Sequence, residues 1–326
     1  MIFPKRGAAI DRNNVKIASV QVYLDSNLMA LLPREDAVSP EFLYYLIVHE
    51  KLGRIADSST IPQINNKHII PHEVLIPPLP EQQKIADILG TWDEALEKLD
   101  ALIAAKERRK RGLIQQLLAG NRRVNGATGK WQWERLDSVC EQIERKAPVG
   151  IERVLSITAG TGFQDQREKF SRVIAGRNLE NYVHIKRGEF SYNKGNSGQY
   201  PQGCVYRLEE FDEGAVPNVW ISFAIKDPRL IGDYIKHFFL AGGHNHQLSR
   251  LINYGVRNDG LLNLTAKSFF SIKVPVPPLE EQRELGRFFE LLAKELRLLR
   301  DQRAAVDQQK RGLMQKLLTG KVRVSV

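Results

Sequence analysis

One segment of the chain, Asn193 to Tyr200, concentrates side chains that suit contacts with nucleic acid. It contains two glycines, a lysine and several amide and hydroxyl side chains. The glycines allow the backbone to approach a phosphate closely, and an amide side chain matches the hydrogen-bonding edge of adenine. A solvated hairpin turn is the alternative. On the first interpretation, the DNA contacts come from Asn193, Lys194, Asn196, Ser197, Gln199 and Tyr200.

A second polar run, His244 to Gln247, follows two glycines. Its imidazole and amide groups could contact bases, belong to a structural loop, or hold a metal ion. A metal site needs further ligands, and the two cysteines lie far apart with no CxxC spacing. We therefore expect no metal. DNA contact and a structural loop remain as alternatives for His244, Asn245 and His246.

Short basic turns are candidates for phosphate contacts, because Lys and Arg supply most of the affinity of proteins for the DNA backbone. Lys186-Arg187-Gly188 is one such turn, and Lys5-Arg6-Gly7 is similar to the segment after Asn193. An ordinary charged turn explains them equally well. The same alternatives apply to Arg172, Arg177 and Asn178.

The sequence offers no set of residues that would catalyse a reaction. The segment from Gly126 to Lys130 lacks the spacing of a phosphate-binding P-loop, and Trp131 stands where a Ser or Thr would follow the lysine. No Asn/Asp-Pro-Pro-aromatic tetrapeptide, GxSxG or HExxH motif occurs. We expect no catalytic residue, and a nuclease is the least favoured interpretation.

An internal repeat in the sequence predicts the main helices of the chain. Residues 74–124 align without a gap on residues 274–324, and twenty of the 51 positions are identical. Each copy starts after a Pro-Pro pair, carries Glu in its first turn and ends near a glycine, which predicts one long helix. About 40 residues would span roughly 60 Å.

Both helices carry leucine-rich stripes with alternating spacings of four and three, which are typical of a coiled-coil seam. Charge favours antiparallel pairing, because the acidic first half of helix one would then lie beside the basic second half of helix two. The predicted seam consists of Ile85, Leu89, Trp92, Leu96, Leu99, Ile103, Leu113 and Leu117 in the first copy, and of Leu285, Phe289, Leu292, Leu296, Leu299, Val306, Leu313 and Leu317 in the second.

The rest of the chain is predicted to be α+β. Strands are expected at 154–157, 182–185, 204–208 and 220–225, and a helix at 231–240. Residues 1–79 resemble the second half of this domain, and a counterpart of residues 130–188 is missing. We therefore expect a truncated start. The expected parts are a partial domain (1–79), a first helix and linker (80–124), a complete domain (125–279) and a second helix (280–326).

Composition bounds the class of protein. The 326 residues leave room for about two domains, and 42% hydrophobic residues exclude a disordered chain. The net charge of +10 favours a polyanionic partner. Two isolated cysteines, no apolar leader and no long apolar run predict a cytoplasmic protein without a membrane segment.

The chain resembles the DNA specificity subunit of type I restriction-modification enzymes. The resemblance lies in Pro77-Pro-Leu-Pro-Glu-Gln-Gln83 and Pro277-Pro-Leu-Glu-Glu-Gln-Arg283, each opening a helix that ends in Lys-Arg-Gly-Leu and Leu-Leu-x-Gly. It implies target recognition domains, one partial and one complete, that alternate with two spacer helices. Each recognition domain would read one half of a bipartite target, with the helices fixing the gap between the halves.

The resemblance also implies the partners. These are double-stranded DNA, two modification (methyltransferase) subunits and the restriction (motor-nuclease) subunits. S-adenosylmethionine, ATP and magnesium would belong to those subunits, and this chain would hold no cofactor. Self-association of two chains would supply two complete recognition domains and a symmetric target. A coiled-coil protein-interaction scaffold without DNA specificity is the alternative function.

Overall fold

The computed structural model describes residues 1–34, 36–57, 61–118, 120, 122–124, 129–170, 179–195, 200–253 and 261–325. The chain forms two compact units: unit 1 comprises Met1–Lys106 and Leu296–Val326, and unit 2 comprises Glu107–Glu295. Helices and strands are mixed in both, as expected for an α+β fold. Each long helix contributes one part to each unit, so the units are not the four consecutive segments expected from the sequence.

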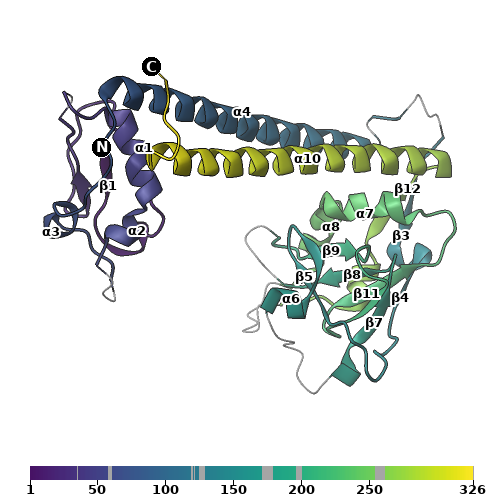
Figure 1. The fold of residues 1–326 in the computed structure, drawn as a ribbon. Coiled ribbons are helices and arrows are strands. Elements are labelled where there is room, and N and C mark those ends of the chain that lie inside the picture. Colours follow the sequence, from purple (N-terminus) through teal and green to yellow (C-terminus); the bar gives the residue numbers. More distant parts are fainter. Residues whose placement is uncertain are drawn as a thin grey trace. The chain divides into compact units, whose positions relative to one another are not determined.

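The two long helices form where the repeat predicts them (Figure 1). Helix α4 runs over Leu79–Leu118 and helix α10 over Leu279–Leu318. Each starts after a Pro-Pro pair, and each is followed by a glycine with positive φ, 71° at Gly120 and 68° at Gly320. A left-handed glycine here lets the chain turn back and satisfy the last helical carbonyls.

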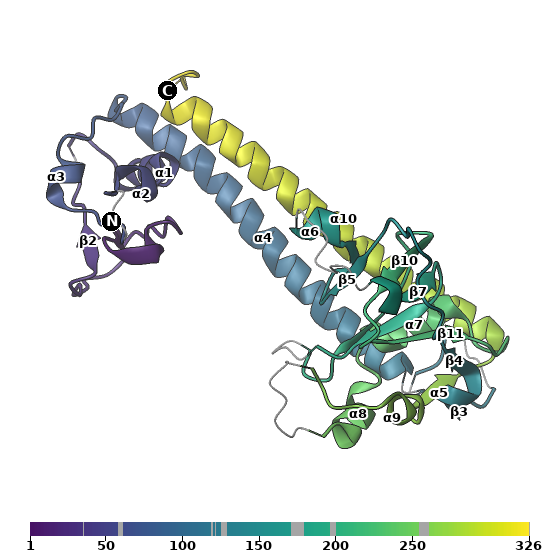
Figure 2. The same ribbon diagram turned by 90° about the horizontal axis from the view of Figure 1, so that it is seen from below.

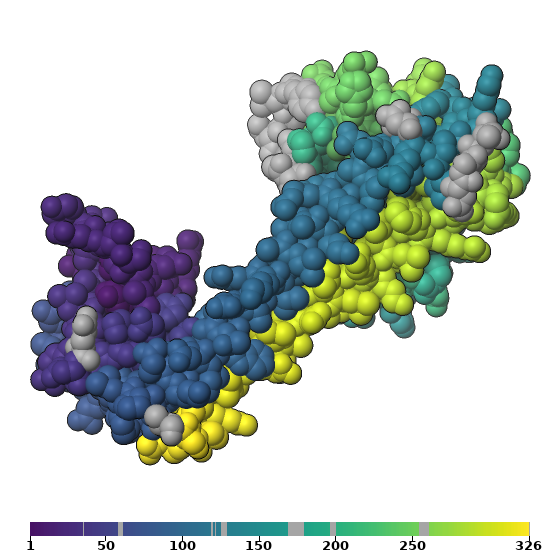
Figure 3. All heavy atoms as spheres, turned by 90° about the horizontal axis from the view of Figure 1, so that it is seen from above, coloured from purple at the N-terminus to yellow at the C-terminus, as the bar shows by residue number. Residues whose placement is uncertain are grey.

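The helices pack together in antiparallel orientation, as the charge distribution predicts (Figures 1 and 2). Within unit 1, Lys310 pairs with Asp93, and Arg303 pairs with Asp100 at 3.1 Å. Residue numbers therefore rise along one helix as they fall along the other. In the space-filling view the atoms of the two helices touch (Figure 3).

Every residue of the predicted coiled-coil seam is buried or half-buried. Leu89 and Leu285 are both fully buried, and Leu96 and Leu296 keep exposed fractions of 8% and 6%. Burying a leucine side chain contributes about 1.5–3 kcal/mol.

The rest of unit 1 is small. Strands β1 (Ile2–Pro4) and β2 (Leu28–Ala30) pair antiparallel, and the helical segments are η1 (Gly7–Ala9), α1 (Pro40–Glu50), α2 (Leu52–Ile55) and α3 (Asn66–Ile69). Helix α1 begins at Pro40, and the Ser39 hydroxyl accepts a hydrogen bond from the Phe42 amide at 3.1 Å. The buried face of α1 packs on the first part of α4 and the last part of α10.

Unit 2 is built around a four-stranded antiparallel sheet in the order β4-β11-β8-β9. Three further strand pairs, β5-β6, β7-β10 and β3-β12, lie outside this sheet. The elements of unit 2, besides the parts of α4 and α10, are β3 (Gln132–Arg135), α5 (Leu136–Val139), β4 (Cys140–Gln142), β5 (Leu155–Thr158), β6 (Gly162–Asp165), α6 (Gln166–Phe170), η2 (Leu179–Asn181), β7 (Val183–Lys186), β8 (Phe190–Asn193), β9 (Cys204–Arg207), β10 (Glu213–Val216), β11 (Ile221–Ile225), α7 (Gly232–Leu240), α8 (Asn245–Leu251), α9 (Ala266–Phe270) and β12 (Lys273–Val276).

The expected strands and helix of this domain are confirmed as β5, β7, β9, β11 and α7, each within a residue or two of its predicted bounds. An aromatic core lies between the sheet and helices α7 to α9. Phe190 stacks on Phe223 with ring centroids 5.1 Å apart, and Tyr192 stacks on Phe269 at 4.7 Å. Offset stacking of this kind adds to the free energy gained by burying the rings.

In each unit, one buried glutamine connects the first turn of a long helix with the segment that precedes a shorter helix, α1 in unit 1 and α7 in unit 2. The Gln82 carboxamide donates to the carbonyls of Pro77 and Ala37 and accepts from the Ser39 amide at 2.9 Å. The Gln282 carboxamide does the same with three equivalent groups: it donates to Pro277 and Arg229 and accepts from Ile231. Helix α1 in unit 1 therefore corresponds to α7 in unit 2.

Candidate nucleic-acid interface

The loop after β8 is held at its base by backbone contacts. The Asn193 side chain accepts a hydrogen bond from the Gly195 amide at 2.8 Å, which tightens the turn. The Lys194 carbonyl accepts from the Leu262 amide at 2.9 Å, and Gly195 forms an isolated bridge with Leu261. Two segments far apart in the sequence thus meet at the carboxyl end of β8.

A third segment reaches the same loop through tyrosines. Tyr200 forms a hydrogen bond with Tyr206, and the Tyr206 hydroxyl accepts from the Gly160 amide at 2.7 Å. Burial raises the pKa of Tyr206 above its usual value, so the hydroxyl stays protonated. The turn between β5 and β6 therefore lies beside the loop. Sequence reasoning missed Tyr206 and this turn, since alternation alone marks them only as strand and turn.

Three of the predicted residues are described: Asn193 ends β8, Lys194 follows it, and Tyr200 lies shortly before β9, the strand that pairs with β8. They offer a cation, an amide and a phenol. This combination can bind phosphate oxygens and the edges of bases. Six other predicted residues, Arg172, Arg177, Asn178, Asn196, Ser197 and Gln199, lie outside the described residues.

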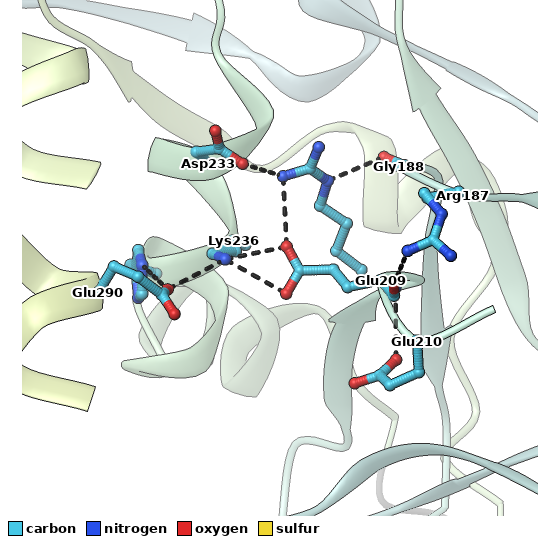
Figure 4. Close-up of polar contacts among 9 residues, drawn as sticks. Arg187, Gly188, Glu209, Glu210, Asp233, Lys236 and Glu290 are labelled. Atoms are coloured by element: carbon cyan, nitrogen blue, oxygen red, sulfur yellow. Dashed lines mark hydrogen bonds and ion pairs between the residues drawn. The ribbon is translucent and has the colours of Figure 1, made fainter. Parts of the chain in front are cut away.

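The basic turn Lys186-Arg187 lies at the opposite end of β8 from this loop. Arg187 pairs with Asp212 at 2.9 Å and also donates to the Glu209 carbonyl (Figure 4). Lys186 is exposed, and its amide donates to the Glu189 carboxylate at 2.6 Å. Acidic groups therefore offset the positive charge of this turn, which is separate from the loop.

His244 does not lie on the surface, which corrects the prediction that it contacts DNA. Its exposed fraction is 2%, and its ring packs near Phe239 and Tyr192 in the aromatic core. Neither ring nitrogen has a hydrogen-bond partner. Burial lowers the pKa of His244 to about 4, so the ring is neutral at pH 7.

The residues after His244 form helix α8 rather than the structural loop that was considered. Asn245 is the first helical residue and is half-buried, and Gln247 exchanges two hydrogen bonds with the backbone of Lys273. His246 is exposed and lies 3.2 Å from Arg250. Among the described residues, no group of His, Cys, Asp or Glu is arranged to hold a metal ion.

Unit 1 repeats the arrangement at the end of its own strand. The Lys5 carbonyl accepts from the Ile64 amide at 2.9 Å, and the Gly7 amide donates to Pro62 at 2.8 Å. Lys5 is half-buried and Arg6 is exposed. The Lys5-Arg6 segment thus stands in unit 1 where Lys194-Gly195 stands in unit 2.

Comparisons with known proteins all match the chain to DNA specificity proteins of type I restriction-modification systems. Residues 12–106 match the family model of the type I restriction modification DNA specificity domain. Two curated proteins of Methanocaldococcus jannaschii, named as the MjaX and MjaVIII specificity subunits of type I restriction enzymes, are 25% and 22% identical to this chain. These alignments cover 91% and 92% of this chain and 72% and 74% of the two proteins.

Over most of its length the chain is similar to type I restriction-modification specificity subunits, and residues 12–106 match their DNA specificity domain. The fold agrees: the crystal structure of a type I S subunit from M. genitalium matches with a TM-score of 0.57 at 18% identity, covering 97% of this chain and 82% of that one. A structure described in terms of assembly and conformational transition of the type I system matches with a TM-score of 0.54 at 16% identity, covering 91% and 75%. Both curated relatives are named as specificity subunits, which agrees with the expectation that this chain supplies no catalytic residue.

Sequence reasoning missed the structural role of the two buried glutamines, Gln82 and Gln282. The Pro-Pro-Leu motifs marked the helix starts, but no role was predicted for Gln82 or Gln282. Their presence at equivalent places in both copies was the available signal.

Among the described residues, every helix is too short or too polar to span a membrane.

Proposed function

We propose that this specificity subunit reads a bipartite DNA target, one half through unit 2 and the other through the smaller domain of unit 1. The observation that supports this proposal is that Asn193 and Lys194 lie at the end of β8 and Tyr200 lies shortly before β9, the strand that pairs with β8. Amide and hydroxyl groups would read base edges there, and Lys194 would bind phosphate. Lys5 and Arg6 would do the same in unit 1.

We further propose that the paired helices dock two modification subunits, with the restriction subunits joining that assembly. Arg111, Gly112 and Gln115 recur as Arg311, Gly312 and Gln315, and all six are exposed. Contacts within the chain do not explain the glycines, because a Cβ added at either one would meet no atom within 4 Å. An exposed helical glycine costs about 1 kcal/mol relative to alanine. Two such glycines at equivalent places suit close approach by two like partners.

On this proposal the chemistry belongs to the partners. The modification subunits would bind S-adenosylmethionine and methylate DNA, and the restriction subunits would use ATP and magnesium. The assembly would work in the cytoplasm, where DNA and these cofactors are present. This chain would contribute sequence selection and geometry.

The proposal is tested by expressing the chain with its modification subunit and sequencing the methylated bases of the host DNA. We expect a new bipartite motif. An asymmetric motif would show that the two units read different half-sites, and a symmetric one would show that two chains pair. As a control, the same modification subunit is shown to methylate DNA together with another specificity subunit. If it then yields no new motif with this chain, the proposed role is wrong.

A second experiment separates DNA selection from a purely scaffolding role. The complex of this chain with the modification subunit is titrated with duplexes that carry or lack the motif, at several salt concentrations. We expect binding that falls with salt and is stronger for the motif, because phosphate contacts release counterions and base contacts discriminate. A coiled-coil scaffold would show no preference between the duplexes.

A further inference from the structure

A pocket of about 240 Å³ lies at one edge of the four-stranded sheet of unit 2. Its lining includes residues at the end of β4 and residues just before β11. In the antiparallel register, Tyr192 of β8 lies opposite Ile221 of β11, and Gln142 of β4 lies opposite Phe223. The carboxyl ends of β4 and β8 therefore lie at the same edge as the amino end of β11. The pocket and the loop after β8, proposed above to contact DNA, thus share one edge of the sheet.

Three carboxamide side chains line this pocket, those of Gln142, Asn181 and Asn218. All three residues are exposed, and among the described residues their carboxamides make no hydrogen bond. A carboxamide can donate one hydrogen bond and accept another in parallel, which matches N6 and N7 of adenine in the major groove. The pocket therefore presents groups of the kind that read an adenine.

The pocket also has an apolar wall, to which Trp220 contributes. Trp220 is half-buried and packs against the hydrophobic cluster around Leu155 and Phe163, which holds its ring in place. The opposite side is fixed by the backbone, since the Ala147 amide donates to the Tyr182 carbonyl at 2.8 Å. Thymine carries a methyl group in the major groove, and apolar side chains recognise it. The carboxamides and the apolar wall together complement both bases of an A·T pair.

The charged residues of the pocket separate it from a phosphate site. One acidic residue, Glu144, and one basic residue, Lys146, line it, and both are exposed. Arg145, which lies between them in the sequence, pairs with Glu189 at 2.7 Å. A phosphate contact favours an excess of positive charge, because the DNA backbone is anionic. The balanced charge of this pocket suits the uncharged edges of bases instead.

We propose that this pocket reads an A·T base pair within the half-site of unit 2. Gln142 ends β4, and Asn218 lies shortly before β11, the neighbouring strand of the sheet. Their carboxamides would contact N6 and N7 of the adenine, and the thymine methyl group would lie against Trp220. This assignment rests on the DNA-reading role proposed above and adds to it the chemistry of one position in the target.

The test compares methylated motifs in host DNA between the parent complex with the modification subunit and a complex whose chain carries Gln142→Ala and Asn218→Ala together. We expect the double variant to accept other base pairs at one A·T position, with discrimination there reduced about tenfold. Both residues are exposed, so the double variant should fold like the parent chain. Gln83→Ala removes an exposed carboxamide from α4 in unit 1 and should leave the motif unchanged.

Modified duplexes identify the groups that are read at that position. Replacing its adenine by 7-deazaadenine removes N7, and replacing its thymine by uracil removes the methyl group. We expect 7-deazaadenine to weaken DNA binding by the parent complex about tenfold and to have no further effect on the double variant, because the contact is already lost. Uracil should weaken binding by the parent complex and by the double variant alike, since Trp220 is present in both.

The outcomes distinguish this proposal from the proposed function. If the parent complex yields no new motif, the DNA-reading role is wrong and this assignment is wrong with it. If the parent complex has a motif and Lys194→Ala weakens DNA binding, but the double variant keeps the motif or relaxes it only at a G·C pair, the pocket assignment alone is wrong. Equal weakening by 7-deazaadenine in the parent complex and the double variant would also refute it.

Discussion

Arg123 donates hydrogen bonds from Nε and Nη2 to the two carboxylate oxygens of Glu281, at 2.7 and 2.6 Å. The same pair occurs in unit 1, where Arg323 donates to Glu81 at 2.8 and 2.6 Å. Each arginine follows the end of one long helix, and each glutamate lies in the first turn of the other. These pairs close both ends of the antiparallel helix pair with the same bidentate geometry.

The two pairs differ in burial, which gives the first prediction. The side chains of Glu281 and Arg123 are 2% and 24% exposed, and Glu281 also accepts from the Trp131 indole at 2.9 Å. Arg323 is 67% exposed. We expect Glu281→Gln to lower the free energy of unfolding by about 1–3 kcal/mol, since it leaves buried donors unpaired. Glu81→Gln is the matched control and should cost less, because solvent screens its partner. Chemical denaturation measures both, and equal effects would contradict this view.

A second prediction concerns the buried glutamines. Gln82→Ala removes three hydrogen bonds and leaves the Ser39 amide without its acceptor. We expect a loss of about 2–3 kcal/mol and loosening of α1. Gln83, the next residue, is exposed and bonds only to Asp87 among the hydrogen bonds described. Gln83→Ala should change the free energy of unfolding by less than about 0.5 kcal/mol. Hydrogen exchange of the α1 amides provides a direct readout.

The exposed glycines give a third prediction, in which stability and assembly change in opposite directions. Gly112→Ala and Gly312→Ala should each stabilise the isolated chain by about 0.5–1 kcal/mol, because alanine favours the helix and nothing obstructs its methyl group. If partners approach closely at these places, the same substitutions should weaken binding of the modification subunit. Gly90→Ala is a poor control because its Cβ would lie 3.7 Å from the Tyr45 hydroxyl, so Ala105→Gly serves instead. Unaltered assembly in both alanine variants would exclude these glycines from the docking surface.

The loop after β8 gives a fourth prediction. Lys194→Ala should weaken DNA binding about equally for all sequences and reduce its dependence on salt, as expected for a phosphate contact. Asn196→Ala and Gln199→Ala should instead relax discrimination at one base by about 1–3 kcal/mol. Lys98→Ala, on an exposed part of α4 in unit 1, removes the same charge elsewhere. Unchanged DNA binding in all three loop variants would remove this loop from the interface.

A fifth prediction follows from the buried histidine. The pKa of His244 is about 4 in the folded chain, against about 6.5 in an unfolded one. As the pH falls from 6.5 towards 4, the unfolded chain binds a proton that folded His244 does not, so the free energy of unfolding falls. Between pH 7 and pH 5 this loss is on the order of 2 kcal/mol.

His244→Phe should remove that part of the pH dependence, and it should be at least as stable as the parent chain at pH 7, since it eliminates two ring nitrogens without partners. His246→Phe, which changes the neighbouring exposed histidine in the same way, is the matched control. His237, whose pKa burial also lowers to about 4, keeps a residual slope in both variants. Urea denaturation at pH 7 and pH 5 measures the difference, and an unchanged slope in His244→Phe would refute the assignment.

Much of the architecture was predictable because it depends on periodic or repeated signals. The similarity of residues 74–124 to residues 274–324 indicated two equivalent helices. The spacing of Leu89, Leu96 and Leu99 indicated the seam between them. Prolines and glycines at defined places set the helix ends. Charge favoured antiparallel pairing, and the ion pairs of Lys310 with Asp93 and of Arg303 with Asp100 agree with it.

The sequence by itself thus determined the repeat, the helices, their pairing and most strands of unit 2, because these depend on local periodicity and on the duplicated segment. Only the tertiary structure placed His244 in an aromatic core, paired Arg187 with Asp212, and separated the Lys186-Arg187 turn from the Lys194 loop. Burial depends on which distant elements pack over a residue, and ion pairing depends on which strands become neighbours. Neither is encoded in spacing along the chain.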